Sequence, residues 1–286
     1  MSEEQNIQWF PGHMAKTRRT IKESLNLVDA VAEIVDARVP QSSRNPEINS
    51  LISGKPRIIL LNKCDMADAV ATAKWINYYK SQNITALAVD CRTGSGLKGF
   101  RSAVMNLLGE KLERYRQKGM VGKTLKIMVV GIPNVGKSSF INKMCGANRA
   151  KAENRPGVTR GNQWFKIDKD LELLDTPGIL WPKFDDKAVG EKLAFTGAVK
   201  DAVLDTELLA VRLLETISGD YFDLIKNRYG VEYDEDSYEL LCAIGKRRGM
   251  VQRGGVTDTE RAANMLLEEY RNCKIGRITL EKPEEI

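Results

Sequence analysis

Long apolar runs are missing from this chain of 286 residues, and none approaches the ~20 residues that would cross a bilayer. The first residues, Met-Ser-Glu-Glu-Gln-Asn, lack the basic start and apolar stretch of a secretory signal. These two absences predict a soluble, cytoplasmic protein that does not act in a membrane. Histidine occurs once, and the five cysteines are scattered without Cys-x-x-Cys spacing. The sequence therefore indicates neither a zinc site nor a disulfide framework.

Charge is distributed unevenly along the chain. The net charge is +6, but residues 1–180 hold 28 Lys and Arg against 17 Asp and Glu, whereas residues 181–286 hold 16 against 21. Within the acidic part, residues 246–277 again carry a basic excess, 8 against 4. This segregation suits a polyanionic partner such as RNA. A solvated surface without a partner is the alternative interpretation.

The length and the hydrophobic fraction of 42% predict two domains, 1–181 and 182–286. In the first, apolar strand-like runs alternate with helical patterns, which favours an α/β fold with a mostly parallel sheet. We expect strands over 30–35, 57–61, 85–89 and 125–130, and helices over 16–27, 67–80, 100–115 and 139–144. After Pro182 the amphipathic stretches 206–217 and 258–271 predict an all-helical second domain, with no convincing strand before the last few residues.

The segment Gly131-Ile-Pro-Asn-Val-Gly-Lys-Ser138 has the pattern of a phosphate-binding P-loop between a strand and a helix. Its glycines let the backbone approach phosphate oxygens, which the N–H groups at the start of the next helix would bind. Lys137 would supply a cation to the β and γ phosphates and assist catalysis, and Ser138 would bind Mg²⁺. The expected nucleotide contacts from this loop are Asn134, Val135, Gly136, Lys137, Ser138 and Ser139.

A second motif selects the base. Asn62, Lys63, Cys64 and Asp65 follow a predicted strand directly. The Asp65 carboxylate can accept hydrogen bonds from the N1–H and the exocyclic amine of guanine, which adenine cannot supply in that geometry. A site built this way can reject the wrong base by roughly 10⁴-fold, because its polar atoms would stay unpaired. The sequence therefore predicts GTP and GDP as ligands.

Asp90-Cys91-Arg92 lies at the end of the next predicted strand, at the place of a backbone-mediated guanine contact, with Asp90 and Cys91 as the expected nucleotide contacts. This assignment departs from the usual Ser-Ala-Lys in every side chain. A plain turn after a strand is the alternative.

Two segments downstream of the P-loop have the order expected of switch I and switch II. In Pro156-Gly-Val-Thr159, Thr159 would reach Mg²⁺ only when a γ-phosphate is present. In Asp175-Thr-Pro-Gly178, Asp175 would hold Mg²⁺ through water and the Gly178 N–H would touch the γ-phosphate. The spacing leaves room for one helix and one hairpin between the P-loop and Asp175.

The base motif precedes the P-loop, which is the reverse of the order in Ras-like GTPases and predicts a P-loop GTPase domain in circularly permuted order. Residues 9–180 resemble the circularly permuted GTPases of the YlqF/RbgA family, the ribosome biogenesis GTPase A group. The Trp9-Phe-Pro-Gly-His-Met14 opening, Asp36-Ala-Arg-Val-Pro40 and the segment from Gly245 to Arg271 also resemble that family. The resemblance implies a bacterial factor that binds the large ribosomal subunit late in assembly, hydrolyses GTP and leaves. We expect it to act as a monomer.

GTP hydrolysis requires a residue that orients the attacking water. Ile179 and Leu180, which follow Gly178, have aliphatic side chains and cannot do this, so another residue must. In the resembled family the N-terminal histidine, here His13, is the proposed catalytic replacement. The alternative is a tethering segment in which His13 only hydrogen-bonds locally. Asn134 could similarly help bind K⁺ beside the phosphates, or make a simple polar contact within the loop.

Basic residues near the C-terminus would contact RNA phosphates, with a solvated helix rim as the alternative. They are Lys246, Arg247, Arg248, Arg253, Arg271, Lys274 and Arg277. Because permutation attaches the second domain directly to switch II, the nucleotide could control its position. The leading hypothesis is a GTP-hydrolysing assembly factor for the large ribosomal subunit. A GTP-regulated switch module that acts on a protein partner is the second, and a tRNA-modifying or ATP-driven enzyme is the third.

Overall fold

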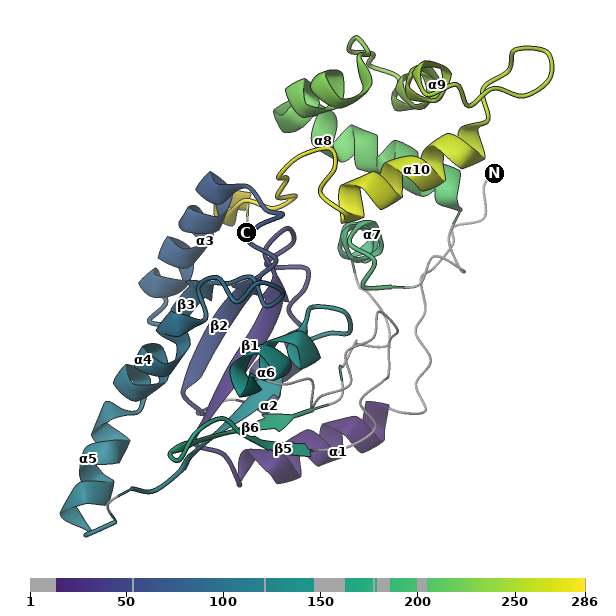
Figure 1. Ribbon diagram of the computed structural model, residues 1–286. Coiled ribbons are helices and arrows are strands. Elements are labelled where there is room, and N and C mark those ends of the chain that lie inside the picture. Colours follow the sequence, from purple (N-terminus) through teal and green to yellow (C-terminus); the bar gives the residue numbers. More distant parts are fainter. Residues whose placement is uncertain are drawn as a thin grey trace.

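The computed structural model describes residues 14–52, 54–120, 122–146, 163–176, 178, 186–199 and 205–285. One sheet organises the first part of the chain, with strand order β3-β2-β1-β4-β6-β5 (Figure 1). The strands are β1 (Ala30–Asp36), β2 (Arg57–Asn62), β3 (Thr85–Ala88), β4 (Leu125–Val130), β5 (Gln163–Lys166) and β6 (Leu171–Asp175). All neighbours pair in parallel except β5 with β6, which pair antiparallel.

Helices surround the sheet and form the second part of the chain. Those of the first part are α1 (Met14–Leu25), α2 (Pro46–Leu51), α3 (Ala69–Ser81), α4 (Lys98–Leu107), α5 (Gly109–Gln117) and α6 (Lys137–Cys145). Those of the second are α7 (Lys187–Phe195), α8 (Thr206–Tyr229), α9 (Ser237–Arg247), α10 (Thr259–Arg271) and the short 3₁₀ helix η3 (Pro283–Glu285). Among the described helices, none combines the length and the apolar content that crossing a bilayer requires.

The central strands are buried on both faces, which explains their nearly continuous apolar sequences. Every residue of β1 is buried, as parallel strands covered by helices require. On one face Phe100 of α4 and Phe140 of α6 pack edge to face with ring centroids 5.0 Å apart. On the other face Trp75 and Tyr79 of α3 are fully buried. The predicted α/β class with a mostly parallel sheet is therefore confirmed.

Several predicted elements agree closely with the structure, and the differences have local causes. The strand predicted over 125–130 is β4, and the hairpin expected before Asp175 is β5 with β6. The helix predicted over 100–115 is divided at Leu108, where the backbone leaves helical angles. Helix α8 extends twelve residues beyond the predicted 206–217, with a kink at Tyr221.

The helical domain has a core of its own. Leu213 of α8, Leu241 and Ile244 of α9 and Leu266 of α10 are fully buried in one apolar cluster. Aspartate side chains accept hydrogen bonds from first-turn N–H groups at the beginning of four helices, a common way to satisfy otherwise unpaired donors. These caps are Asp186 of α7, Asp205 of α8, Asp236 of α9 and Asp258 of α10.

The C-terminal segment returns to the first domain, which the sequence did not predict. The sequence allowed a strand in the last few residues, but residues 276–282 lie in none, and their main chain bonds to loops of the first domain. Ile278 N donates to Met66 O and Leu280 N to Arg38 O. The Glu281 carboxylate accepts from the main-chain N–H groups of Gln41 and Ser42. The yellow segment beside α3 in Figure 1 is this tail. The cores also cross the predicted boundary at 182, since Leu193 and Val199 belong to the apolar cluster of the sheet and Val39 to that of the helical domain.

Candidate nucleotide-binding site

Asn62 joins the two predicted nucleotide motifs. Strands β2 and β4 both flank β1 in parallel, so the loops after them leave the same edge of the sheet. The Asn62 Nδ2 atom donates to Val135 O of the P-loop at 2.6 Å, and its Oδ1 atom accepts from Cys91 N at 2.9 Å. Asn62 is 3% exposed, so these bonds lie inside the protein. One side chain therefore connects the base motif, the P-loop and the loop after β3.

The P-loop turns at Gly136, whose φ of +103° is favourable only for glycine. A Cβ atom at this position would also collide with the Asn62 amide nitrogen. Helix α6 begins directly afterwards, and its first turn holds neither a capping side chain nor an acidic residue. The first N–H groups of α6 and the positive end of its dipole are therefore oriented for an anion.

Lys137 is buried at the start of α6. Its Nζ atom donates to Gly131 O at 3.1 Å and to Ile132 O at 2.9 Å, so the side chain folds back over the loop. Burial lowers the pKa of Lys137 to about 8, although the charge of Asp175 acts in the opposite direction. A nucleotide phosphate would replace the carbonyl contacts with an anionic partner and raise this pKa again.

We therefore expect GDP binding to take up protons above neutral pH. With a free-state pKa of about 8, uptake should be about one tenth of a proton at pH 7 and about one half at pH 8. Because the bound pKa is the higher one, affinity is fully present below pH 8 and weakens as pH rises above it. Calorimetry in buffers of different ionisation enthalpy measures this uptake. Zero uptake at pH 8 would contradict the assignment of Lys137 as phosphate ligand.

Switch II reaches the P-loop from β6. Asp175 ends β6 and is 2% exposed, and the Thr176 hydroxyl donates to Val129 O of β4 at 2.7 Å. A Cβ atom on Gly178 would lie 2.8 Å from Lys137 Nζ and 2.9 Å from Pro133 N, so only glycine lets this segment approach so closely. The Gly178 main chain is therefore at the place where a γ-phosphate would meet Lys137.

The residues near the P-loop fit the Mg²⁺ that GTPases use. The Ser138 hydroxyl and the Asp175 carboxylate offer the hard oxygen donors that this ion prefers, and nucleotide phosphates would supply further oxygens. Asp175 ends β6, and Ser138 lies in the first turn of α6, which follows the neighbouring parallel strand β4. When bound, the ion would neutralise charge on the transferred phosphoryl group. Thr159, the expected switch I ligand, lies outside the described residues, as does His13.

The base-recognition loop is held at both ends. Lys63 has a φ of +61°, which is uncommon for a residue with a side chain, and its Nζ atom lies 2.8 Å from Asp36 Oδ2. Cys64 N donates to Val89 O at 3.3 Å. Asp65 pairs with Arg92 at 3.2 Å, and the Arg92 side chain is 76% exposed. An ion pair this exposed is weak, so a guanine base at the predicted position would be able to displace Arg92 from the Asp65 carboxylate.

The loop after β3 differs in part from its predicted guanine-contacting role. The Asp90 carboxylate accepts from Arg92 N at 2.8 Å and from the Thr93 hydroxyl, which is the role of a residue that stabilises a turn. The Cys91 N–H, which a guanine oxygen would need, donates to Asn62. Cys91 thus bonds to Asn62, and Asp90 stabilises the turn that follows. The exposed Arg92 of the same tripeptide pairs with Asp65, a contact that the sequence did not predict.

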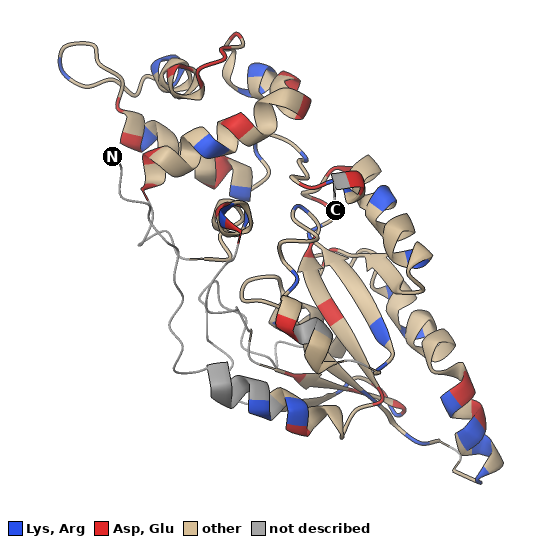
Figure 2. Ribbon diagram, turned by 180° about the vertical axis from the view of Figure 1, so that it is seen from behind, with Lys and Arg blue, Asp and Glu red and all other residues tan. Residues whose placement is uncertain are grey.

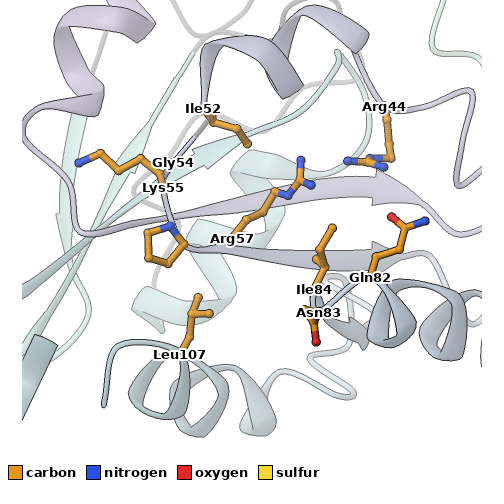
Figure 3. A pocket seen from close by; sticks show the side chains of 10 residues that line it. Arg44, Ile52, Gly54, Lys55, Arg57, Gln82, Asn83, Ile84 and Leu107 are labelled. Atoms are coloured by element: carbon orange, nitrogen blue, oxygen red, sulfur yellow. The ribbon is translucent and has the colours of Figure 1, made fainter. Parts of the chain in front are cut away.

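The described residues also line a cavity of about 430 Å³ that is separate from this site (Figure 3). It lies at the amino ends of β2 and β3, whereas the nucleotide motifs follow their carboxyl ends. Figure 3 shows the guanidinium groups of Arg44 and Arg57 turned toward each other and the Lys55 side chain turned away. Arg44 and Arg57 both bond to Glu33, which neutralises part of their charge.

The basic residues predicted to contact RNA divide into two groups. Lys246, Arg247, Arg253, Lys274 and Arg277 are exposed, and Figure 2 marks basic residues on the projecting loop between α9 and α10. Two others have bonds within the protein. Arg248 donates to Arg228 O at 3.2 Å and lies over the Tyr229 ring. Arg271 donates to Phe195 O and Ala194 O at 3.1 and 2.8 Å, so its guanidinium fastens α10 to α7 and does not project as a free phosphate ligand would.

Comparisons of sequence relate this chain to known GTPases. The sequence model of a family described as 50S ribosome-binding GTPase matches residues 126–227, a range that begins in the strand before the P-loop. The ribosome biogenesis GTPase A of Priestia megaterium is 51% identical over 281 residues, which cover 98% of this chain and 98% of that protein. The protein of the same name from Thermotoga maritima is 31% identical over 280 residues, which cover 98% and 96%.

Solved structures share the fold as well as the sequence. The crystal structure of GNP-bound YlqF from T. maritima matches with a TM-score of 0.65 and 29% identity, covering 95% of this chain and all of that one. The GDP-bound structure of the T. maritima protein has the same TM-score at 28% identity and covers 92% and 99%. These similarities span both domains. The chain belongs to the ribosome biogenesis GTPase A family.

Proposed function

We propose that this protein hydrolyses GTP during assembly of the large ribosomal subunit and binds rRNA in a nucleotide-dependent way. The observation that carries the nucleotide part is Asn62, which bonds the base motif to the P-loop inside one site. Membership of the family makes the chain a GTP-hydrolysing enzyme with a role in ribosome biogenesis. The description of the matching family as a 50S ribosome-binding GTPase supports the large subunit as its partner. We also propose that the protein acts in the cytoplasm as a monomer.

Hydrolysis in this site depends on positioning and charge. The α6 amides and Lys137 would hold the phosphates, and Ser138, Asp175 and Thr159 would hold Mg²⁺. His13 is our candidate for orienting water, because Ile179 and Leu180 offer no polar group and His13 directly precedes α1. For K⁺ we propose Asn134. Its Nδ2 atom donates to Gly197 O at 3.0 Å, so its side-chain carbonyl oxygen is the atom that would face the cation.

The RNA-binding surface that we propose is the end of α9 and the loop that follows it. Lys246 and Arg247 occupy the last turn of α9, and Arg253 lies on the loop, all of them exposed. The loop has glycines with positive φ at 249, 254 and 255, which let a backbone approach closely. Phosphate contacts from such residues release counterions and make binding sensitive to salt.

Replacing both Lys246 and Arg247 by glutamine should weaken binding to large ribosomal subunits and lower the slope of log affinity against log salt by about 2. The substitution Arg212→Gln is a matched control, because Arg212 is half-exposed on α8 of the same domain and pairs only with nearby Glu215 among the ion pairs of the described residues. Sedimentation with subunits over a salt series measures both. An unchanged slope in the double variant would contradict this surface.

Large ribosomal subunits also distinguish the assembly factor from the second candidate function, a switch that acts on a protein partner. Stimulation of GTP hydrolysis by isolated ribosomal proteins, equal to that by whole subunits, would favour the protein partner. Stimulation by subunits alone would favour the assembly factor.

A further inference from the structure

A buried ion pair lies at the carboxyl end of β1, between the two domains. Asp36 and Arg38 are each 2% exposed. The Asp36 Oδ1 atom accepts from Arg38 Nε at 3.0 Å, and Oδ2 accepts from Arg38 Nη2 at 2.8 Å, a bidentate arrangement. Nothing in the nucleotide chemistry described above uses this pair.

On one side, the pair holds the base-recognition loop. The Asp36 Oδ2 atom that accepts from Arg38 also lies 2.8 Å from Lys63 Nζ. Lys63 stands between Asn62 and Asp65, and its positive φ must be maintained by such contacts. Asp36 therefore fixes the residue on which the position of the base motif depends.

On the other side, Arg38 inserts between two helices of the helical domain. Its Nη1 atom donates to Arg271 O at the end of α10, and its Nη2 atom to Thr196 O just after α7, at 3.4 and 3.5 Å. Its guanidinium carbon lies 5.6 Å from the centre of the Tyr270 ring. Helix ends carry unpaired carbonyls and partial negative charge, so one cation stabilises both.

The electrostatics of the three side chains make their positions interdependent. Burial by itself would raise the pKa of Asp36, but Arg38 and Lys63 together lower it well below its usual range. Burial lowers the pKa of Lys63, and Asp36 opposes this effect. Removing one member would leave a buried charge without compensation, which is costly. A shift of Lys63 is therefore felt at Arg38, and a shift of Arg38 at Lys63.

We propose that Asp36 and Arg38 are positioning residues that couple occupancy of the guanine site to the seating of α7 and α10. They act through Lys63 on the base end of the nucleotide, so GDP engages this coupling as well as GTP. This differs from a switch that depends on the γ-phosphate. The inference rests on the proposed guanine site at Asn62–Asp65.

Hydrogen exchange of the full chain with and without GDP tests the coupling. The reporters are the amides of Gly197 and Cys273, which bond to the last turns of α7 and α10. In the wild type, GDP should slow their exchange about tenfold, within the range typical of coupled sites. In Arg38→Met, GDP should leave their exchange unchanged, and GDP affinity should fall about tenfold.

Arg44→Met is the matched control. Arg44 is also a largely buried arginine of the first domain, paired with a carboxylate, Glu33, and lying over a tyrosine ring, that of Tyr79. The variant loses a comparable ion pair, so a general loss of stability would affect both proteins alike. GDP should still slow both reporters in Arg44→Met. The proposal would be overturned if GDP slowed the reporters in Arg38→Met as much as in the wild type. It would also be overturned if Arg44→Met lost the slowing to the same extent as Arg38→Met.

Arg38→Lys covers the case in which Arg38→Met fails to fold. Lysine keeps a charge beside Asp36 but cannot bridge two carbonyls, so affinity should stay near wild type while the reporters lose their response to GDP. Retention of that response would again overturn the coupling. If the wild type binds GDP no better than ADP, the guanine site itself is wrong, which is a distinguishable result.

Discussion

Replacing Asp65 by asparagine should lower the affinity for GDP by about a thousandfold, because a site built around a carboxylate leaves its partners unpaired when that group changes. The amide would present an N–H₂ donor to the exocyclic amine of guanine, where the carboxylate presented an acceptor. Isothermal titration of the two proteins with GDP measures the difference.

Xanthosine diphosphate provides the test of mechanism for this variant. Xanthine carries a carbonyl where guanine carries the amine, so the amide introduced by Asp65→Asn can donate to it and affinity should be partly restored. Arg92→Ala is the control, since Arg92 pairs with Asp65 at 3.2 Å but is mostly exposed. This control should change GDP affinity by less than about fivefold. Equal GDP affinity in wild type and Asp65→Asn would refute the base assignment.

Replacing Asn62 by alanine should lower the free energy of unfolding by about 2 to 4 kcal/mol, because two buried partners lose their hydrogen bonds at once. These partners are Val135 O of the P-loop and Cys91 N of the loop after β3. Nucleotide affinity should fall as well, since the two halves of the site would no longer be held together. Urea unfolding and GDP titration measure the two effects.

Asn45→Ala separates stability from binding. Asn45 is 1% exposed and its Oδ1 atom accepts from Glu47 N, and it belongs to neither motif. This variant should lose stability while GDP affinity stays near wild type. If Asn62→Ala lost stability but kept full GDP affinity, the bridging role of Asn62 would be wrong.

The sequence predicts the motifs of the site because their chemistry is local. The Gly136 turn, the Lys137 cation and the Asp65 carboxylate each need one residue type at one position next to a strand. The parallel sheet was predictable for a similar reason, because strands such as β1 are buried on both faces and read as apolar runs. The convergence of the loops then follows from parallel pairing alone.

Contacts between distant segments were not predictable from these patterns. Arg38 bonds to the carbonyl of a residue 233 positions away, and Gln41 to a carboxylate 240 positions away. Arg271 shows the consequence, because its sequence neighbourhood suggested a phosphate ligand whereas its guanidinium fastens α10 to α7. Local charge does not reveal whether a long side chain turns outward or pairs with helix ends inside the protein.

The central claim is that the base motif and the P-loop bind one and the same nucleotide, and a crystal structure of this protein with GDP and Mg²⁺ tests it most directly. We predict that the guanine N1–H and amine donate to Asp65 while the β-phosphate of the same molecule contacts Lys137 Nζ and the first amides of α6. A nucleotide whose phosphates occupy the P-loop while its base lies away from Asp65 would contradict the account.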